Sequence, residues 1–418
     1  MNIARPAIIR GHHRQSTGRG LQQSESERFR QSRIDKNAAV MGRPAVKRWD
    51  LITPMAFRER HRSIQVVAID KLEELLEHLA LLRFLPLRII TTAEDEHQIV
   101  GVLPLYLKSH SQGEYVFDYS WADAFERAGG RYYPKLQCSV PFTPATGRRL
   151  LTRPDIDDPN VEKYLLSGMM QVAEKMEVSS VHVTFAEKQQ WQLMGQMGFL
   201  QRTHNQFHWQ NDGYINFDDF LAALSSKKRK NIRRERREAL SAGVEIELLT
   251  GDRILEEHWD AFYRFYIDTG NRKWGTPYLT REFFSIIGAT MSKDVLLIMC
   301  RRDNRYIAGA INFIGGECLF GRNWGCVEDH PFLHFEVCYY QAIEFAIDRG
   351  LQRVEAGAQG QHKLARGYMP THTYSAHWIA NASFRDAVDN FLSEERRYVD
   401  EEIGYIAEHG PFRRSDDT

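Results

Sequence analysis

Cysteine is scarce in this 418-residue sequence. The five cysteines are an odd number, and no two of them form a CxxC pair. This pattern argues against a disulfide framework and fits a reducing compartment. Cys326 and Cys338 flank His330 and His334, but their spacing matches no familiar zinc pattern. We therefore expect neither disulfides nor a metal site.

Long hydrophobic runs and an excess of one charge are also missing. No apolar stretch approaches the roughly 20 residues that a helix needs to cross a bilayer. The 55 basic and 55 acidic residues give a formal net charge of zero. Any nucleic-acid partner would therefore have to be recognised by a local patch. Because no hydrophobic signal region follows Met1, we expect a cytoplasmic protein.

The first 62 residues differ in composition from the rest of the chain. They hold 12 Arg and 2 Lys against 5 acidic residues, with little hydrophobic periodicity. Such a segment cannot bury enough apolar surface to offset the entropy of ordering. We interpret residues 1–62 as a disordered or degenerate extension. An Arg-rich targeting segment and a nucleic-acid arm are the alternatives.

The remaining chain divides into two similar halves, residues 63–213 and 214–410. The first half predicts helices over 71–83, 161–176 and 188–198 and strands over 87–92, 99–107, 178–185 and 207–209. The second half predicts helices over 217–224, 225–242, 254–270, 280–290, 335–349 and 384–409, and strands over 244–249, 295–300, 306–313, 317–324, 352–355 and 372–379. This order indicates an α/β protein with mixed (α+β) sheets rather than a doubly wound parallel sheet.

An internal repeat links the ends of the two halves. Gly198-Phe199 precedes His208-Trp209, and Gly367-Tyr368 precedes His377-Trp378. In both halves the glycine lies 11 residues before the tryptophan. We interpret this as a duplication. The His-Trp pairs, each on a final strand, are expected to be core residues.

Four long segments resemble one known family. They are LPLYLKSHSQGEYVFD (103–118), RYYPKLQCSVPFTPATGRRLL (131–151), LHFEVCYYQAIEFAIDRGL (333–351) and VEAGAQGQHKLARGYMP (354–370). They are similar to the FemAB-like predicted N-acyltransferases, and the resemblance covers roughly residues 95–400. It implies two tandem GNAT-like acyl-CoA N-acyltransferase domains of the peptidoglycan biosynthesis or recognition type. Residues 1–90 match the family pattern poorly.

Acyl transfer to an amine needs a base, donors for the developing oxyanion and a group that holds the activated donor. The loop after strand 352–355 offers all three. Glu355 and His362 are candidate bases, and Lys363 is a candidate catalytic cation. The candidate binding residues are Gly357, Gln359, Gly360, Arg366 and Tyr368. The alternative is a glycine turn with solvated charges.

A second candidate lies where strand 317–324 leads into helix 335–349. Gly321-Arg322-Asn323-Trp324-Gly325 is followed by His334 and Glu336. Trp324 and His334 are candidate binding residues and Glu336 a candidate catalytic residue. Glu336 would also suit the helix dipole as a simple cap. The Q/R-x-x-G-x-G/A signature of pyrophosphate binding is absent, which argues against ordinary acetyl-CoA binding in this half.

Two further candidates are basic. Eight of the eleven residues from 227 to 237 are Lys or Arg, and Lys227, Lys230 and Arg234 would share one helix face. This face predicts an anion platform for the phosphates of CoA, tRNA or a lipid-linked precursor, with a solvated face as the alternative. Lys108 and His110 open a polar and aromatic cluster that suits an amine or sugar-like ligand. The alternative there is a packed aromatic loop.

These patterns together predict an acyltransferase that acts on an amine acceptor without a metal. Acyl-CoA is the favoured donor, because the two long charged helices of aminoacyl-tRNA-dependent relatives are represented here by one basic helix. An aminoacyl-tRNA donor is the alternative within this class. The alternative outside it is a non-catalytic protein that binds cell-wall or lipid precursors through a degenerate transferase cleft. A third class is nucleic-acid binding through residues 227–237.

Overall fold

The computed structural model describes residues 55–59, 62–68, 84–93, 99–273, 277–357 and 360–413. The helix predicted over 71–83 and most of the predicted extension lie outside these residues. The described structure begins with a strand at Met55, which falls inside the predicted extension.

The elements of the N-terminal half follow the predicted order, and the structure adds strands and a helix that the pattern did not predict. The strands are β1 (Met55–Glu59), β2 (Arg62–Ala68), β3 (Phe84–Ala93), β4 (Ile99–Lys108), β5 (Lys135–Cys138), β6 (Leu151–Thr152), β7 (Ser180–Ala186) and β8 (Leu200–Gln210). The helices are α3 (Tyr119–Arg127), α4 (Val161–Lys175) and α5 (Lys188–Gln196).

The C-terminal half keeps the predicted alternation closely. Its strands are β9 (Glu245–Leu249), β10 (Val295–Arg302), β11 (Arg305–Gly315), β12 (Cys318–Cys326), β13 (Arg353–Glu355) and β14 (Met369–Ile379). Its helices are α6 (Phe217–Ala223), α7 (Ser226–Ala239), α8 (Glu256–Lys273), α9 (Arg281–Met291), α10 (Leu333–Phe335), α11 (Gln341–Asp348) and α12 (Ala382–Glu408). A π-helical turn over Glu336–Tyr340 joins α10 to α11, and a 3₁₀ helix spans Gln361–Arg366.

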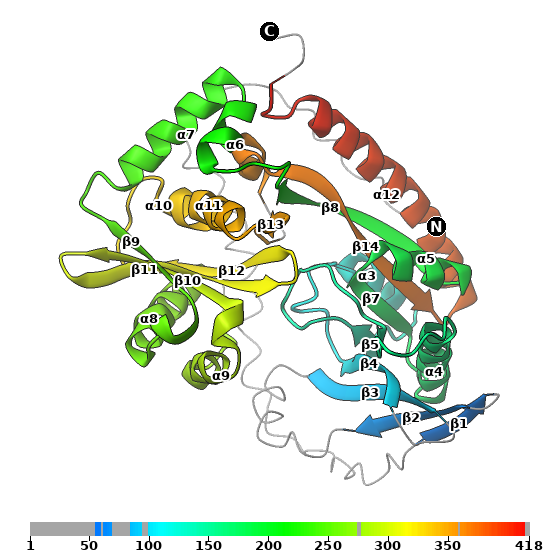
Figure 1. The fold of residues 1–418 in the computed structure, drawn as a ribbon. Helices are drawn as coiled ribbons and strands as arrows, with labels where there is room; N and C mark the ends of the chain where they lie inside the picture. The colour runs from blue at the N-terminus through cyan, green and yellow to red at the C-terminus, as the bar shows by residue number, and fades with distance from the viewer. Residues whose placement is uncertain are drawn as a thin grey trace, which may run out of the picture. The chain divides into compact units, whose positions relative to one another are not determined.

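The described strands form one 14-stranded sheet. Its order is β1-β2-β3-β4-β5-β7-β14-β8-β13-β12-β11-β10-β9, and β6 pairs with β4. The pairs β5–β7 and β12–β13 are parallel, whereas the meanders on both sides are antiparallel. This confirms the predicted mixed α/β class (Figure 1).

The last strand of each half completes the sheet of the other half. β8 closes the N-terminal half in sequence but pairs with β13 of the C-terminal half. β14 closes the C-terminal half in sequence but pairs with β7 of the N-terminal half. β8 and β14 also pair with each other, so these two strands join the halves into one sheet (Figure 1).

The register of β8 and β14 reflects the sequence repeat. Alignment of the two Gly-aromatic pairs makes Leu200 correspond to Met369 and His208 to His377. The structure pairs Leu200 with His377 and His208 with Met369. When each residue is replaced by its counterpart in the repeat, the first pair becomes the second. An approximate two-fold axis therefore passes between β8 and β14.

The repeated His-Trp pairs lie in the interior, as the sequence predicts. His208, Trp209 and His377 are buried, and Trp378 is half-buried. Trp209 pairs with Val354 across β8 and β13, whereas Trp378 pairs with Val181 across β14 and β7.

The C-terminal strands are covered on both faces. Along β10, Leu297 and Met299 pack in the cluster formed with α8 and α9. Leu296 and Ile298 point the other way and pack in the cluster that includes residues of α6, α7 and α11. Burial on both faces explains why β10 reads as a continuous apolar run rather than an alternating one.

The basic segment is separated from the helix before it. Asn216 caps the N-terminus of α6, and its side chain accepts a hydrogen bond from the Asp219 N–H. The chain then becomes extended at Leu224, which forms a bridge with Phe412, and the Ser225 N–H bonds to the Pro411 carbonyl. Because this tail segment takes the backbone groups, α7 starts as a new helix.

A buried ion network fixes the N-terminal half. Lys108 and Lys135 are fully buried, and both contact Glu114. Lys135 Nζ also lies 2.5 Å from Asp118 Oδ2 and 2.7 Å from Ser111 Oγ. Loss of one cation from such a network leaves a buried carboxylate without compensation.

We expect the substitution Lys135→Met to lower the free energy of unfolding by about 3–5 kcal/mol. The side chain keeps its approximate length but leaves Glu114 and Asp118 short of a buried cation. Urea denaturation followed by circular dichroism measures this free energy. Lys163→Met on α4 changes an exposed lysine and is the matched control, with an expected change within about 0.5 kcal/mol. Equal stabilities of the two variants would contradict the assigned role of the network.

Candidate functional site

The candidate site forms where β12 and β13 separate. The two strands pair from Cys318–Arg353 to Phe320–Glu355. β13 ends there, whereas β12 continues to Cys326. The chain after Glu355 leaves the sheet and returns through the 3₁₀ helix into β14. The predicted loop therefore occupies the end of a short strand, where side chains from both faces of the sheet can converge.

Lys363 is enclosed by this loop. Its side chain is 1% exposed, and Nζ donates a hydrogen bond to the Gly357 carbonyl at 2.7 Å. Gly357 and Gly360 have φ values of +80° and +123°, which favour glycine and let the loop fold over the lysine. Burial lowers the pKa of Lys363 to about 8. Among the described carboxylates none forms an ion pair with this ammonium group.

Arg366 anchors the same loop. It donates to the His362 carbonyl at 2.7 Å and to Glu235 Oε2 of α7 at 2.9 Å. Its guanidinium carbon lies 3.5 Å from the ring centroid of Phe335. Tyr340 also donates to Glu235. The charge of Arg366, predicted to bind an anion, is thus already neutralised inside the protein.

His362 is exposed beside an aromatic group. The Tyr339 hydroxyl and His362 Nε2 lie 2.8 Å apart. Burial, together with the charges of Arg366 and Lys363, lowers the pKa of His362. Burial raises the pKa of Tyr339, so the hydroxyl stays protonated, and the His362 tautomer decides which of the two groups donates the hydrogen bond. The buried ring of Tyr368 packs edge-on to Tyr339 at 5.4 Å.

Trp324 and His334, both candidate binding residues, lie close together. Their rings lie 5.5 Å apart, and both line a cavity of about 210 Å³ that also includes the chain from Cys326 to Phe335. The ring of His334 lies 5.6 Å from that of Tyr339, which connects this cavity to the His362 side of the loop.

Glu336 is a candidate catalytic residue in the sequence, but the structure places it in the interior. It is fully buried, and both carboxylate oxygens accept hydrogen bonds from Arg236 of α7 at 3.1 Å. Gln341 donates to the same carboxylate at 2.7 Å. With its acceptors used inside the protein, Glu336 holds α7 against the π-helical turn.

Glu355 lies on the opposite face of the sheet from the Lys363 loop. Its strand neighbour Val354 packs in the cluster formed with α11, so alternation directs Glu355 to the other face, with Phe320 of β12. Glu355 is 4% exposed and accepts from Arg353 Nε at 3.1 Å through Oε1. Oε2 has no hydrogen-bond partner among the described residues. Burial raises the pKa of this carboxyl, and Arg353 opposes the shift.

The basic face of α7 is exposed, as its periodicity predicts. Lys227, Lys230, Arg234 and Arg237 all face solvent. Among the remaining arginines of the helix, Arg233 forms an ion pair with Asp218 at 3.0 Å. Binding of anions by this face therefore remains a prediction. The inner side of the helix is fixed to Glu336.

The N-terminal candidates lie apart from this loop. Lys108 belongs to the buried network and contacts Glu114 Oε1 at 2.7 Å. His110 Nδ1 accepts a hydrogen bond from the Gln112 N–H at 3.1 Å. The structure therefore gives Lys108 a stabilising contact rather than a place in a cleft. Gln359 lies outside the described residues.

Sequence reasoning missed two members of the site. Tyr339 was part of an apolar helix pattern and gave no separate signal. Glu235 is the one acidic residue among the basic residues 227–237, and a lone carboxylate in such a run indicates an inward-facing ion pair. Its partner is Arg366, which is 131 residues away in sequence.

Two kinds of feature are absent from the described residues. In this part of the chain no helix is long and apolar enough to cross a membrane. The same residues contain no group of three or more side chains that could hold a metal ion.

Comparison with known proteins identifies the family. The model of the FemAB-like family, described as peptidoglycan biosynthesis/recognition, matches residues 83–414. The chain is similar to the crystal structure of FemX (12% identity, 77% of this chain and 94% of that chain covered, TM-score 0.47) and to L-PGS from Bacillus licheniformis (11%, 77% and 96%, 0.46). It is also similar to a tandem GNAT protein from the clavulanic acid biosynthesis pathway (11%, 72% and 84%, 0.38).

No curated protein sequence matches the chain. The family match spans well over half of its residues and confirms the family that the motifs predict. The chain belongs to the FemAB-like family of peptidoglycan biosynthesis/recognition proteins.

Proposed function

We propose that this protein is an N-acyltransferase that moves an acyl or aminoacyl group from an activated donor to an amine acceptor at the opening between β12 and β13. The observation that carries the proposal is Glu355, a buried carboxylate with one oxygen unpartnered among the described residues, at the end of β13. Membership of a family described by peptidoglycan biosynthesis and recognition supports this reaction class.

In this reaction the amine nitrogen attacks the carbonyl carbon of the donor. The C–N bond forms, the bond to the leaving group breaks, and the nitrogen loses one proton to a base. Glu355 is the base that we favour, because its raised pKa gives the carboxylate a higher proton affinity than an exposed glutamate has. His362, neutral because of its lowered pKa, is the alternative acceptor of the proton.

The donor is assigned to the other face of the sheet. The loop that holds Lys363 packs there through Leu364 and Tyr368, and the Trp324–His334 cavity is on the same side. Lys363 is a buried cation without an ion pair to a described carboxylate. An ammonium group in this position suits a donor phosphate or the developing oxyanion. We favour acyl-CoA as the donor, with aminoacyl-tRNA as the alternative. Donor and acceptor would then meet at the strand opening from opposite faces.

A second candidate function is recognition without catalysis. It is favoured by the internal use of Glu336 and Arg366, which are tied to Arg236 and Glu235 and leave fewer groups for a reaction. A protein of this kind would bind a cell-wall or lipid precursor and show no turnover.

Lys363→Met tests the donor site. We expect the dissociation constant for CoA, measured by titration calorimetry, to rise at least about tenfold, since a charge-assisted hydrogen bond to phosphate is lost. The control Lys188→Met changes an exposed lysine at the start of α5 and should leave the affinity unchanged. Equal CoA affinities of wild type and Lys363→Met would refute this role. Failure of the wild type to bind CoA would refute acyl-CoA as the donor.

The same site predicts a pH dependence. The lysine is charged below its lowered pKa of about 8 and neutral above it. CoA affinity should therefore fall as the pH rises from about 7 to about 9, well before an ordinary lysine loses its proton. Calorimetric titrations at several pH values measure this fall. Lys363→Met should lack this step, and an identical profile in the variant would contradict the assignment.

Glu355→Gln tests the base. We expect a fall in kcat of about 100-fold or more, because the amide cannot accept the proton, while CoA binding is retained. Release of the CoA thiol from acetyl-CoA in the presence of peptidoglycan stem peptides measures turnover. If His362→Gln shows the larger loss, His362 is the base. If the wild type binds both ligands without thiol release, recognition without catalysis is the better account.

A further inference from the structure

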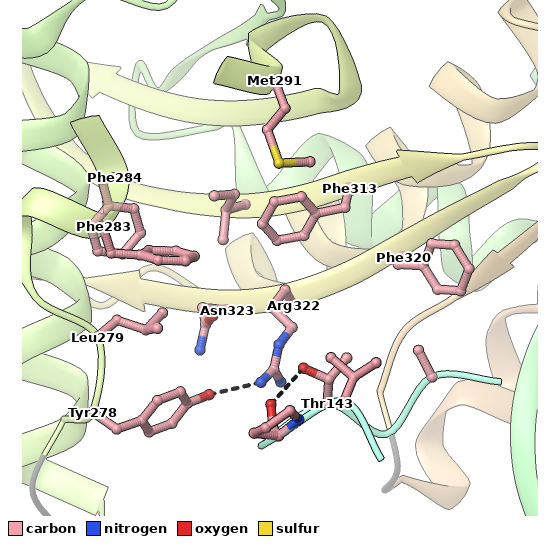
Figure 2. Close-up of a pocket in the computed structure, with 14 residues that line it drawn as sticks. Thr143, Tyr278, Leu279, Phe283, Phe284, Met291, Phe313, Phe320, Arg322 and Asn323 are labelled. Atoms are coloured by element: carbon pink, nitrogen blue, oxygen red, sulfur yellow. Dashed lines mark hydrogen bonds between the residues drawn. The ribbon is translucent and has the colours of Figure 1, made fainter. Parts of the chain in front are cut away.

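A cavity of about 420 Å³ lies on the Glu355 face of the C-terminal strands. Three parts of the chain form its walls: the loop at residues 140–145, the segment from Tyr278 into α9, and strands β11 and β12 (Figure 2). The volume lies within the range of small-molecule sites in proteins.

One wall of the cavity is held by a contact between the loop at residues 140–145 and Tyr278. The ring of Phe142 stacks on that of Tyr278 with centroids 4.2 Å apart. Phe142 has a φ of +54°, a left-handed conformation that costs energy for a bulky residue, and its N–H bonds to the Gly113 carbonyl. A Cβ at Gly113 would lie 2.7 Å from this ring. Gly113 and Tyr278, which lie about 30 and 140 residues from the loop in sequence, therefore hold this wall in place.

Most of the lining is apolar. Phe283 and Phe284 of α9, Met291, and Phe313 and Phe320 of the strands surround the space (Figure 2). Such a surface favours a ligand with an apolar body, because burial of that body releases water from apolar atoms.

The polar groups of the cavity lie together on one side. Arg322 points from β12 toward Tyr278 and Thr143, and its Nη2 donates to the Tyr278 hydroxyl at 2.8 Å (Figure 2). Burial raises the pKa of Tyr278 to about 12, so this hydroxyl is protonated. Among the described carboxylates none forms an ion pair with Arg322. Asn323 Oδ1 also has no hydrogen-bond partner among the described residues.

A half-buried guanidinium without a described counter-charge, beside an apolar space, is complementary to an anion on an apolar molecule. Arginine presents a planar fork of donors that matches a carboxylate or a phosphate. One of its donors reaches Tyr278, which also orients the fork.

Two residues that line the cavity are neighbours of the candidate base or of a residue that acts on it. Phe320, which lines it, is the strand partner of Glu355 and lies on the same face. Ala145, on the opposite wall, precedes Thr146, which lies close enough to Glu355 to lower the pKa of its carboxyl. One wall of the cavity therefore includes the strand neighbour of Glu355 at the end of β13.

We propose that this cavity binds the acceptor, and that the acceptor is an amine with an apolar body and one carboxylate or phosphate group, which Arg322 contacts. The role as acceptor rests on the proposed function. The binding of an apolar anion does not, and can be measured in the absence of turnover.

Calorimetric titration of the full chain with decanoate and with decanol tests the site. We expect saturable binding of decanoate, weakened at least tenfold by Arg322→Met, while the affinity for uncharged decanol stays unchanged. Ala145→Leu, which fills the cavity, should weaken both ligands. Arg397→Met removes an exposed arginine of α12 that is not part of this lining and is the control. Circular dichroism and thermal melting would verify that each variant is folded.

Three results would overturn the proposal: no decanoate binding by the wild type, equal decanoate affinities of wild type and Arg322→Met, or undiminished binding by folded Ala145→Leu, which would indicate an adventitious site. The same experiments distinguish failure of the cavity proposal from failure of the proposed function. Decanoate binding that depends on Arg322, without any thiol release in the assay for Glu355, would support the site and refute the transferase. Thiol release that Arg322→Met leaves unchanged would keep the transferase and refute this acceptor site.

Discussion

The antiparallel pairing of β8 with β14 is the interaction on which the rest of the structure depends. These strands close their own halves in sequence and complete the opposite half in space. The exchange places β13 beside β8, so the short strand that carries Glu355 is fixed by residues from both halves. It also brings the loop at 140–145 against β11 and β12, where the apolar cavity forms. Neither the base nor the cavity could be assembled by one half of the repeat.

Two sets of buried charges then hold the surroundings of this junction. In the N-terminal half two lysines are neutralised by Glu114 and Asp118. In the C-terminal half α7 is fixed through Glu235 and Arg236 to the loop and to the π-helical turn. Lys363 and Arg322 differ from all of these, because neither forms an ion pair with a described carboxylate. This contrast between satisfied and available cations separates the residues that hold the fold from those assigned to ligands.

Much of this arrangement was predictable from sequence, and the exceptions have a common cause. Segments with strong periodicity, such as β10 and α12, were predicted to within a few residues. The equal spacing of the Gly-aromatic and His-Trp pairs indicated the repeat. β5 was missed because it carries Lys135 and Gln137, whose burial depends on partners elsewhere in the chain. The loop after β13 was identified as the site, but only the structure shows that Glu355 points away from the cluster in which Leu364 and Tyr368 of that loop pack. The cavity was missed because its walls are about 180 residues apart in sequence.

The central claim is that donor and acceptor occupy opposite faces of the C-terminal sheet and meet where β12 and β13 separate. The most direct measurement is a calorimetric titration of CoA into protein already saturated with decanoate, repeated with the order reversed. The account predicts that both ligands bind together and that each keeps its affinity within about threefold. Mutual exclusion of CoA and decanoate would place them in one pocket and contradict the account.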